Sequence, residues 1–199
     1  MLIFTRNPEL GKCKTRLAAT IGNVSALKVY EFLLQHTAAV TRGVSATKRV
    51  YYSEEIWEDD LWSDPVFEKH LQEGIDLGAR MHQAFKNGFE EGFEKIIIIG
   101  SDLYDIDTEA LENAFQALDD HDFVIGPAED GGYYLLGMKT LEPQLFNNKV
   151  WGTGTVLKDT LSDLQGSNLY RMQSRNDVDI YEDIADIEAF KPFFTHLKK

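Results

Sequence analysis

Four cationic side chains lie close together near the start of the chain, and their types suit phosphate binding. With a glycine and a threonine they form the set Arg6, Gly11, Lys12, Lys14, Thr15 and Arg16. Arginine makes paired hydrogen bonds to phosphate oxygens, whereas lysine supplies a concentrated positive charge. Glycine lets the backbone approach a ligand, and the N–H groups at a helix start point towards an anion. We expect these residues to bind the diphosphate or triphosphate of a nucleotide; a solvated basic turn is the alternative.

Three aspartates are candidates for holding a divalent cation. Asp102 follows a run of four isoleucines, and Asp177 and Asp179 alternate in a later acidic segment. Mg²⁺ takes oxygen ligands, commonly one or two carboxylates together with substrate phosphates. In an extended segment Asp177 and Asp179 project to the same side, so either could join Asp102. Asp102 could alternatively cap a turn. Of Asp177 and Asp179, we expect one to be a metal ligand and the other to cap a helix; Asp179, for instance, could cap a helix that begins near Tyr181.

A glycine-rich acidic segment, residues 126–134, offers groups that could meet a second substrate. Gly131 and Gly132 allow a ligand to approach the backbone, and Tyr133 follows them. Asp130 could accept a hydrogen bond from a substrate hydroxyl or act as a general base. An Asp-Gly pair is also a strong signal for a hairpin turn, and a hairpin turn is compatible with a site.

Other candidate residues carry weaker signals. In the stretch from Gln72 to Met81, Asp76 could cap the helix that follows. Cys13 lies between two lysines, which should lower the pKa of its thiol, but no base is adjacent, so we expect a small packing residue. The five histidines show no spacing typical of metal ligands.

Strands and helices are predicted to alternate along the chain. Apolar runs predict strands over residues 1–5, 48–52, 95–100, 123–125 and 133–138. Helical spacing predicts helices over 17–33 with a break near Gly22, then 77–89, 107–118 with Asp107 as the N-cap, 155–164 and 181–190. The acidic segment 53–72, which contains two tryptophans, is expected to form short helices.

This alternation is typical of an α/β protein with a mainly parallel sheet, folded as a single domain over residues 1–199. Ligands of such sheets bind outside the carboxyl ends of the strands. We therefore expect the loops 6–16, 101–106 and 126–132, each of which follows a predicted strand, to form one site.

The charge distribution limits the partners of the protein. Its 199 residues include 20 Lys and Arg against 33 Asp and Glu, a net charge of −13. Residues 1–50 nevertheless hold eight basic and two acidic side chains, so a positive segment can select a small polyanion. The acidic bulk argues against nucleic acid and against an anionic membrane surface as partners. The absence of a leader or a spanning apolar run, together with a single cysteine, predicts a cytoplasmic protein.

Several motifs occur along the chain in a recognisable order. They are Phe4-Thr5-Arg6 with Gly11-Lys12 and Lys14-Thr15-Arg16-Leu17, Gln72 to Met81, Gly100-Ser101-Asp102, Gly126 to Leu135, Trp151-Gly152-Thr153, and Asp177-Val178-Asp179 with Glu182-Asp183. This set resembles a family of small bacterial proteins in the nucleotide-diphospho-sugar transferase superfamily, usually labelled glycosyltransferases. The resemblance runs from residue 1 to about residue 190. One departure is Ser101-Asp102-Leu103-Tyr104, where the family usually has Thr-Asp-Cys-Pro.

The resemblance implies a GT-A type fold. Such a fold is a three-layer α/β/α sandwich around a Rossmann-like sheet that is mixed but mainly parallel. The first loop would bind nucleotide phosphates, as its charge already suggests. We also expect Gln72 and Asp76 to contribute to nucleotide binding, and Lys14 and Asp130 to be the catalytic residues.

The resemblance also assigns the remaining acidic and glycine-rich positions. Asp102 would hold Mg²⁺ or Mn²⁺ together with Asp177 or Asp179. The acceptor or the sugar would face the segment that contains Glu129, Gly131, Gly132 and Tyr133.

The reaction itself stays open between three alternatives. The first, which we expect, is glycosyl transfer from a nucleotide-diphospho-sugar to a small-molecule acceptor, with a metal ion neutralising the leaving diphosphate. The second is nucleotidylyl transfer from a nucleoside triphosphate to a phosphorylated small molecule, because the chain is also similar to guanylyltransferases of the molybdenum-cofactor and phospholactate type. The third is a non-catalytic nucleotide-binding domain.

Overall fold

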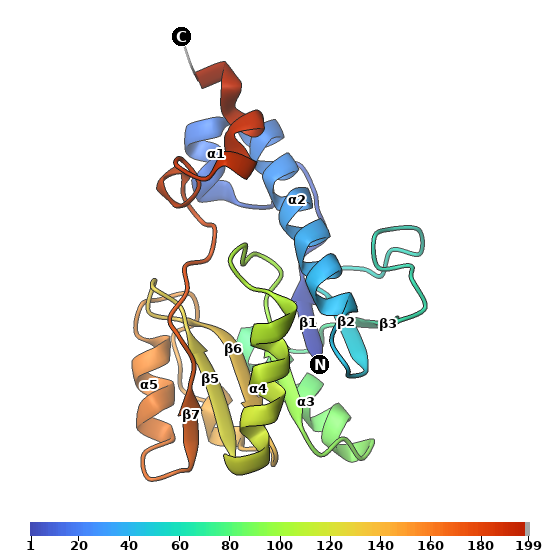
Figure 1. Ribbon diagram of the computed structural model, residues 1–199, viewed down its shortest axis with the longest axis vertical. Helices are drawn as coiled ribbons and strands as arrows, with labels where there is room; N and C mark the ends of the chain where they lie inside the picture. Colours follow the sequence, from blue (N-terminus) through green and yellow to red (C-terminus); the bar gives the residue numbers. More distant parts are fainter. Residues whose placement is uncertain (198–199) are drawn as a thin grey trace.

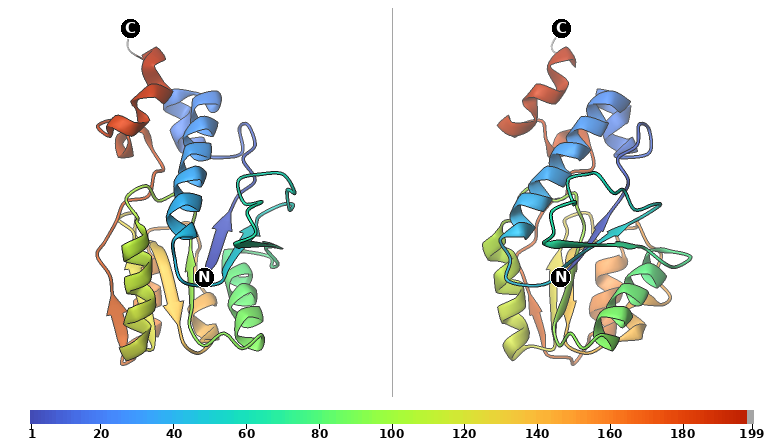
Figure 2. Two further views of the ribbon diagram at one scale, coloured as in Figure 1. Left: turned by 45° about the vertical axis from the view of Figure 1, so that its right-hand side comes forward. Right: turned by 90° about the vertical axis from the view of Figure 1, so that its right-hand side faces the viewer.

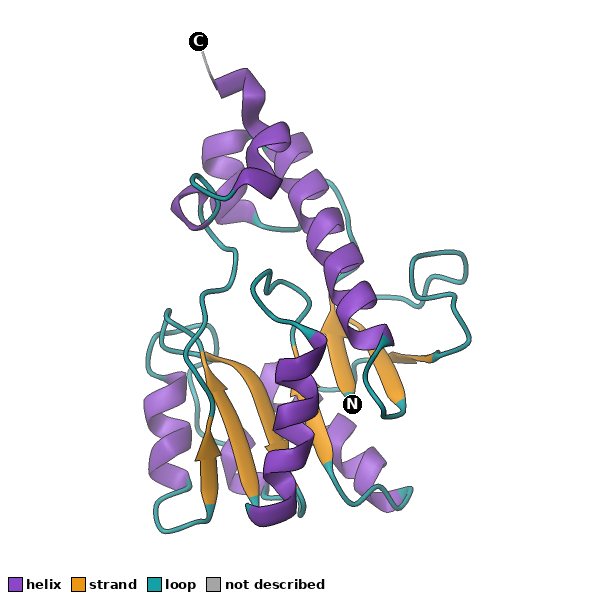
Figure 3. Cartoon of the chain, viewed as in Figure 1, coloured by secondary structure: helices purple, strands orange, loops and turns teal. Residues whose placement is uncertain are grey.

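A seven-stranded sheet forms the centre of the computed structural model, which describes residues 1–197 (Figures 1 and 3). The strands are β1 (Leu2–Thr5), β2 (Lys48–Tyr52), β3 (Phe67–Leu71), β4 (Ile96–Ile99), β5 (Phe123–Pro127), β6 (Tyr133–Met138) and β7 (Leu169–Arg171). Their order across the sheet is β3-β2-β1-β4-β6-β5-β7. All neighbours pair in parallel except at β6, which is antiparallel to both β4 and β5. The predicted mixed and mainly parallel sheet is therefore confirmed.

Helices cover both faces of this sheet, which gives the predicted three layers (Figure 2). The α-helices are α1 (Thr15–Ile21), α2 (Asn23–Arg42), α3 (Leu77–Glu90), α4 (Thr108–Asp120) and α5 (Val156–Asp163). Helices α2 and α4 pack on one face, whereas α3, α5 and the 3₁₀ helix η1 (Pro143–Phe146) pack on the other. None of the helices within residues 1–197 combines the length and the apolar character that a membrane crossing requires.

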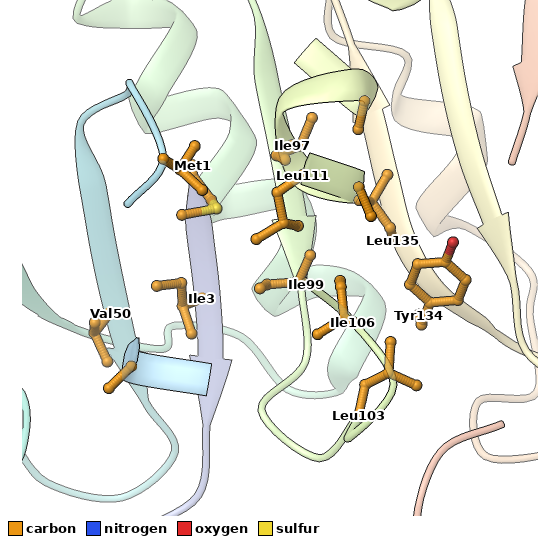
Figure 4. Close-up of a cluster of buried hydrophobic side chains, with 14 of the residues drawn as sticks. Met1, Ile3, Val50, Ile97, Ile99, Leu103, Ile106, Leu111, Tyr134 and Leu135 are labelled. Carbon is orange, nitrogen blue, oxygen red and sulfur yellow. The ribbon is translucent and has the colours of Figure 1, made fainter. Parts of the chain in front are cut away.

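The two faces of the core follow directly from the alternation of side chains along the strands. Ile97 and Ile99 of β4 pack under α2 and α4, together with Ile3 and Leu135 (Figure 4). Ile96 and Ile98 point to the opposite face and pack against α3 and α5. The run of four isoleucines is thus buried on both sides, as is typical of a central strand in an α/β sheet.

A third apolar cluster lies beyond the carboxyl end of β1, away from the sheet (Figure 1). It joins α1 and the first half of α2 to the 3₁₀ helices η2 (Tyr181–Asp183) and η3 (Glu188–Leu197). Its fully or nearly fully buried side chains include Leu17, Leu33 and Phe190. This packing holds the C-terminal segment next to the loop that precedes α1.

Three predictions of local structure are wrong or incomplete. Residues 53–72 form a loop and the strand β3 instead of short helices, because β3 pairs with β2 and the loop is anchored by Trp62, which is buried in the core. The predicted helix 181–190 is replaced by η2 and η3; Pro192, which lacks an N–H, lies inside η3. The strand β7 was not predicted, since it is short and largely exposed. The predicted break at Gly22 is confirmed, where φ is 83°.

Candidate functional site

Two loops that carry candidate residues meet because their strands are neighbours. β1 and β4 pair in parallel, with Ile3 opposite Ile99. Their carboxyl ends therefore lie at one edge of the sheet, and the loops beginning at Arg6 and Gly100 leave it side by side. A cavity of about 520 Å³, here called the main cavity, is lined by residues of both loops. Of the predicted nucleotide-binding residues, it is lined by Arg6, Lys12, Lys14, Thr15, Arg16, Gln72 and Asp76, but not by Gly11.

Lys14 is the most enclosed cation of the basic loop. Its side chain is 7% exposed, against 67% for Lys12 and 70% for Arg16. The ammonium donates a hydrogen bond to Oδ2 of Asp102 at 2.9 Å. Its backbone has a φ of 48°, in the left-handed region that non-glycine residues rarely adopt. Such strain at a cavity wall is a frequent feature of functional sites.

Both members of this pair are held in their charged forms. Burial alone would lower the pKa of Lys14, but the carboxylates of Asp102, Asp179 and Asp177 outweigh burial and raise it. Burial alone would raise the pKa of Asp102, but the Lys14 ammonium outweighs it and holds that pKa below its ordinary value. The main cavity therefore contains a fixed ammonium and a fixed carboxylate in contact.

The late acidic motif reaches the same place from the other end of the chain. The N–H of Val178 donates to the carbonyl oxygen of Asp102 at 3.1 Å, which fixes the segment beside β4. The guanidinium of Arg16 donates to Oδ2 of Asp179 at 2.7 Å. Asp179 does not cap a helix, so that prediction is wrong; instead the carboxylate of Asp183 accepts from the N–H groups of Asp179 and Ile180.

Asp177 lies in a markedly anionic environment. Burial raises the pKa of its carboxyl to about 6, and the nearby carboxylates of Asp102 and Asp130 add to the increase. Lys14 opposes this shift only in part. A cation placed among these carboxylates would relieve their mutual repulsion, and their oxygen atoms are the ligands that Mg²⁺ takes. Within residues 1–197, no three His, Cys, Asp or Glu side chains are grouped closely enough to hold a metal ion on their own.

A buried hydrogen-bond network supports the main cavity from α2. The hydroxyl of Tyr30 accepts a hydrogen bond from the N–H of Arg6 at 2.9 Å. It also lies 3.2 Å from Oγ of Ser101 and 3.4 Å from Oγ1 of Thr5. The network links the ends of β1 and β4, where Arg6 and Asp102 begin their loops. Tyr30 was not a predicted site residue, because at its helical spacing it resembles any core aromatic.

Gln72 and Asp76 line the main cavity, but both side chains already make hydrogen bonds to backbone groups of the protein. The amide of Gln72 donates to the carbonyl oxygens of Thr5 at 3.1 Å and Tyr51 at 2.9 Å. Asp76 caps α3 as predicted, accepting from the N–H of Ala79 at 2.8 Å. These contacts fix the part of the cavity wall that Gln72 and Asp76 form.

Asn7 and Cys13 are structural members of the basic loop. Asn7 is buried, and its side chain bonds to the backbone of Glu54 and Glu55. The Cys13 thiol donates to the carbonyl oxygen of Asn7 at 3.3 Å. Burial raises the pKa of the Cys13 thiol and outweighs the lowering by Arg6 and Lys14, so the expected low pKa is wrong. Cys13 is the packing residue that its lack of a base partner suggested.

The segment 126–134 forms the predicted turn between two antiparallel strands, β5 and β6. Asp130 is exposed, and its Oδ1 accepts from the N–H of Gly132 at 2.8 Å. Gly131 has a φ of 89°, and a Cβ there would lie 2.3 Å from the carbonyl oxygen of Gly154. Glycine at 131 is therefore required by the close approach of two backbone segments.

A second cavity of about 230 Å³ adjoins the main cavity and is here called the Trp151 cleft. The two cavities share Phe4, Leu77 and Gly100 in their walls. Of the predicted acceptor-facing and catalytic residues, Asp130, Gly132 and Tyr133 line this cleft. Glu129 and Gly131 line neither cavity. The pattern around Trp151 was part of the resemblance, but its place beside the main cavity was not predicted.

Comparisons with known proteins agree with this architecture. A family model described as uncharacterized protein conserved in bacteria (DUF2064) matches residues 35–153. A solved protein from Desulfovibrio desulfuricans G20, provisionally named a nucleotide-diphospho-sugar transferase, is 28% identical with a TM-score of 0.87. The alignment covers 99% of this chain and 93% of that one. A comparison with curated proteins gives no match.

Two more distant solved structures share the fold. A cytidylyltransferase from Leptospira borgpetersenii is 14% identical with a TM-score of 0.63, over 97% of this chain and 86% of its own. A nucleotidyl transferase from Methanothermobacter is 15% identical with a TM-score of 0.62, over 98% of both chains. The expected relationship to the nucleotide-diphospho-sugar transferase superfamily is confirmed.

Proposed function

The chain belongs to the family described as uncharacterized proteins conserved in bacteria (DUF2064), and we propose that it is a metal-dependent nucleotidylyltransferase. It is a transferase whose fold is that of the nucleotide-diphospho-sugar transferases. In the proposed reaction, a nucleoside triphosphate transfers its nucleotidyl group to a phosphorylated small molecule. The contact between Lys14 and Asp102 carries the proposal, because it brings a buried cation and a carboxylate together where two parallel strands end.

The basic loop matches the charge of a triphosphate. Arg6, Lys14 and Arg16 line the main cavity, and two of these side chains now pair with aspartates. A triphosphate would replace Asp102 and Asp179 as the partner of Lys14 and Arg16. Guanidinium and ammonium donors aimed at the departing pyrophosphate stabilise the charge that develops on it.

Asp102 and Asp177 are the residues that would hold a divalent cation. Their carboxylates influence one another electrostatically, and the repulsion contributes to the raised pKa of Asp177. Asp179 lines the main cavity, as Asp177 does not, and would be released when Arg16 binds a triphosphate. The electrostatic coupling between Asp177 and Asp102 is the observation that favours Asp177 as the second ligand. A bound Mg²⁺ or Mn²⁺ would supply charge neutralisation for the phosphates.

The proposed step is a displacement at the α-phosphorus of the triphosphate. An oxygen of the acceptor phosphate forms a bond to the α-phosphorus. The bond from that phosphorus to the oxygen bridging to the β-phosphate breaks, and pyrophosphate leaves with the electron pair. An ionised phosphate needs no base; if the acceptor were a hydroxyl, Asp130 at the edge of the Trp151 cleft would accept its proton.

Glycosyl transfer is the second candidate, favoured by the name of the 28% identical relative from Desulfovibrio. In that reaction the acceptor hydroxyl attacks the anomeric carbon of a nucleotide-diphospho-sugar. The bond from this carbon to the diphosphate oxygen breaks, and Asp130 takes the acceptor proton. The same basic loop and the same aspartates would bind the departing nucleoside diphosphate.

Calorimetric titration of nucleotides separates the two candidates. Nucleoside triphosphates and nucleotide-diphospho-sugars are titrated with and without Mg²⁺ into the wild type, Asp102→Asn and Asp119→Asn. Asp119 lies on α4 and pairs with Lys95, so its variant controls for the lost charge. We expect Mg²⁺-dependent binding of a triphosphate that falls about tenfold or more in Asp102→Asn only. Preferential binding of a diphospho-sugar would favour glycosyl transfer, and failure to bind any nucleotide would contradict both candidates.

A further inference from the structure

The Trp151 cleft has walls that differ in kind from those of the main cavity. It lies where β4 ends and the antiparallel strand β6 begins, on the face of the sheet covered by α3. Phe4, Met81, Tyr133, Trp151 and Val156 contribute aromatic and aliphatic surface. The main cavity instead exposes the cations and carboxylates described above. Two adjoining cavities of such different chemistry indicate two ligands: a highly charged one in the main cavity and one with an apolar part in the Trp151 cleft.

Close backbone contacts hold the walls of the Trp151 cleft in place. A Cβ at Gly78 would lie 2.5 Å from Nε1 of Trp151, so the indole lies directly against the first turn of α3. The backbones of Gly131 and Gly154 also approach closely, since a Cβ at Gly131 would lie 2.3 Å from the carbonyl oxygen of Gly154. Met81 on α3 is 5% exposed. The cleft is thus built from packed elements, which reduces the cost of ordering it around a ligand.

The cleft offers few hydrogen bonds to a ligand. The hydroxyl of Thr153 already donates to the carbonyl oxygen of Val150 at 2.7 Å. Among residues 1–197, the only hydrogen-bond partner of the Tyr133 hydroxyl is the sulfur of Met81 at 3.8 Å, which is a weak acceptor. Asp130 lies in the wall with one oxygen accepting from Gly132. The side chains of the wall therefore offer a ligand few polar partners, namely Tyr133, Asp130 and the indole N–H of Trp151.

This inventory discriminates between two classes of acceptor. A polyhydroxylated sugar would leave several hydroxyl groups without partners, and each buried, unpaired polar group costs about 1–3 kcal/mol. An apolar ring would instead gain about 25 cal/mol for each Å² removed from water. The volume of about 230 Å³ lies below the roughly 300–1,000 Å³ of sites for drug-sized ligands, so the cleft suits a small group such as a single ring.

We propose that the Trp151 cleft holds the acceptor and that this acceptor is the phosphate ester of an apolar alcohol with a small ring or short chain, not a sugar phosphate. The role of this ester as the acceptor rests on the proposed nucleotidylyl transfer, whereas the apolar specificity of the cleft does not. The shared wall at Phe4, Leu77 and Gly100 places the phosphate end of such an ester towards Asp102 and Lys14. Trp151, Leu77 and Met81 then determine which esters fit.

Two phosphate esters with six-membered rings test the inference. Cyclohexyl phosphate and glucose 1-phosphate are titrated calorimetrically into the nucleotide-free protein and into the protein with Mg²⁺ and the best-binding triphosphate. The indole N–H resonance of Trp151 is followed by NMR. We expect cyclohexyl phosphate to bind about tenfold or more tightly than glucose 1-phosphate and to shift this resonance.

Variants locate the preference in the cleft. Trp151→Leu should remove most of the preference for the cyclohexyl ester. Leu77→Ser, which alters a side chain that is 43% exposed and so should not disturb folding, should reduce it severalfold. Leu71→Ser is the matched control, since Leu71 is 42% exposed and lines neither cavity.

Equal or tighter binding of glucose 1-phosphate would overturn the inference. So would failure of both esters to bind, or a preference that Trp151→Leu and Leu77→Ser leave unchanged. Failure of the proposed function has a different signature: no triphosphate binds, yet the preference for the cyclohexyl ester and its loss in Trp151→Leu persist.

Discussion

Lys12 and Lys14 stand two positions apart in the same loop, yet they occupy opposite environments. Lys12 is largely exposed and pairs with Glu9, three residues earlier. Lys14 is enclosed, adopts left-handed backbone angles and contacts Asp102 from another strand end. Charge in the enclosed position acts through a lower effective dielectric and is screened less by salt. Lys14 is therefore a cation held in a fixed position, whereas Lys12 is a solvated one.

Replacing each lysine by methionine measures this difference. We expect Lys14→Met to weaken triphosphate binding about tenfold to a hundredfold, because a charge-assisted hydrogen bond contributes about 1.5–3 kcal/mol. Lys12→Met removes the same charge but should weaken binding only about twofold. Calorimetric dissociation constants check the prediction, and thermal unfolding confirms that both variants fold. Similar losses in both variants would show that the loop acts only through its total charge.

The element that shapes the acceptor side is the turn between β5 and β6. Its glycines differ in what they are needed for. Gly131 and Gly166 have nearly the same positive φ, 89° and 86°. A Cβ at Gly131 would collide with the backbone of Gly154, whereas a Cβ at Gly166 would meet nothing within 4 Å. Backbone strain is common to both positions, but close packing against a second segment is specific to Gly131.

Alanine at each position separates these two effects. Gly166→Ala should lower the free energy of unfolding by about 1–2 kcal/mol, the cost of left-handed angles for a residue with a Cβ. Gly131→Ala should lower it by about 3 kcal/mol or more, because the segment at Gly154 must also move. Denaturant unfolding measures both values. Equal losses would mean that the contact with Gly154 relaxes without cost.

Across the whole molecule, a few cations at one edge of the sheet act within a strongly acidic chain. The net charge is −13, and Arg16 is paired with Asp179, which lies 163 positions later. Asp179 therefore neutralises a side chain that a triphosphate would otherwise use. Arg42 and Asp64 form a comparable exposed pair outside both cavities.

Freeing Arg16 should strengthen nucleotide binding. Without Mg²⁺, we expect Asp179→Asn to bind a triphosphate about threefold to fivefold more tightly, in keeping with the small value of an exposed ion pair. Asp64→Asn removes the same charge and frees Arg42, so its smaller effect measures the contribution of net charge alone. The difference should shrink at high salt. Weaker binding by Asp179→Asn would indicate that Asp179 contacts the nucleotide or its metal ion directly.

Local patterns determined the elements and the edge of the sheet where the site lies. The buried isoleucine strand, the caps Asp76 and Asp107 and the break at Gly22 depend on side chains and backbone groups a few residues apart. Since parallel strands end at one edge, the neighbourhood of the basic loop and Asp102 also followed from the order of elements. These features could be predicted because they depend on interactions within single segments or on the order of the segments along the chain.

The pairing of side chains within the site depends on the folded chain as a whole. Nothing in the spacing shows that Lys14 and not Lys12 meets Asp102, that Tyr30 joins two strand ends, or that Arg16 pairs with Asp179. The exposed edge strands β3 and β7 and the raised pKa of Cys13 likewise depend on distant neighbours. Burial, ion pairing and strand pairing at an edge are set by which segments pack together, and that information is spread over the whole chain.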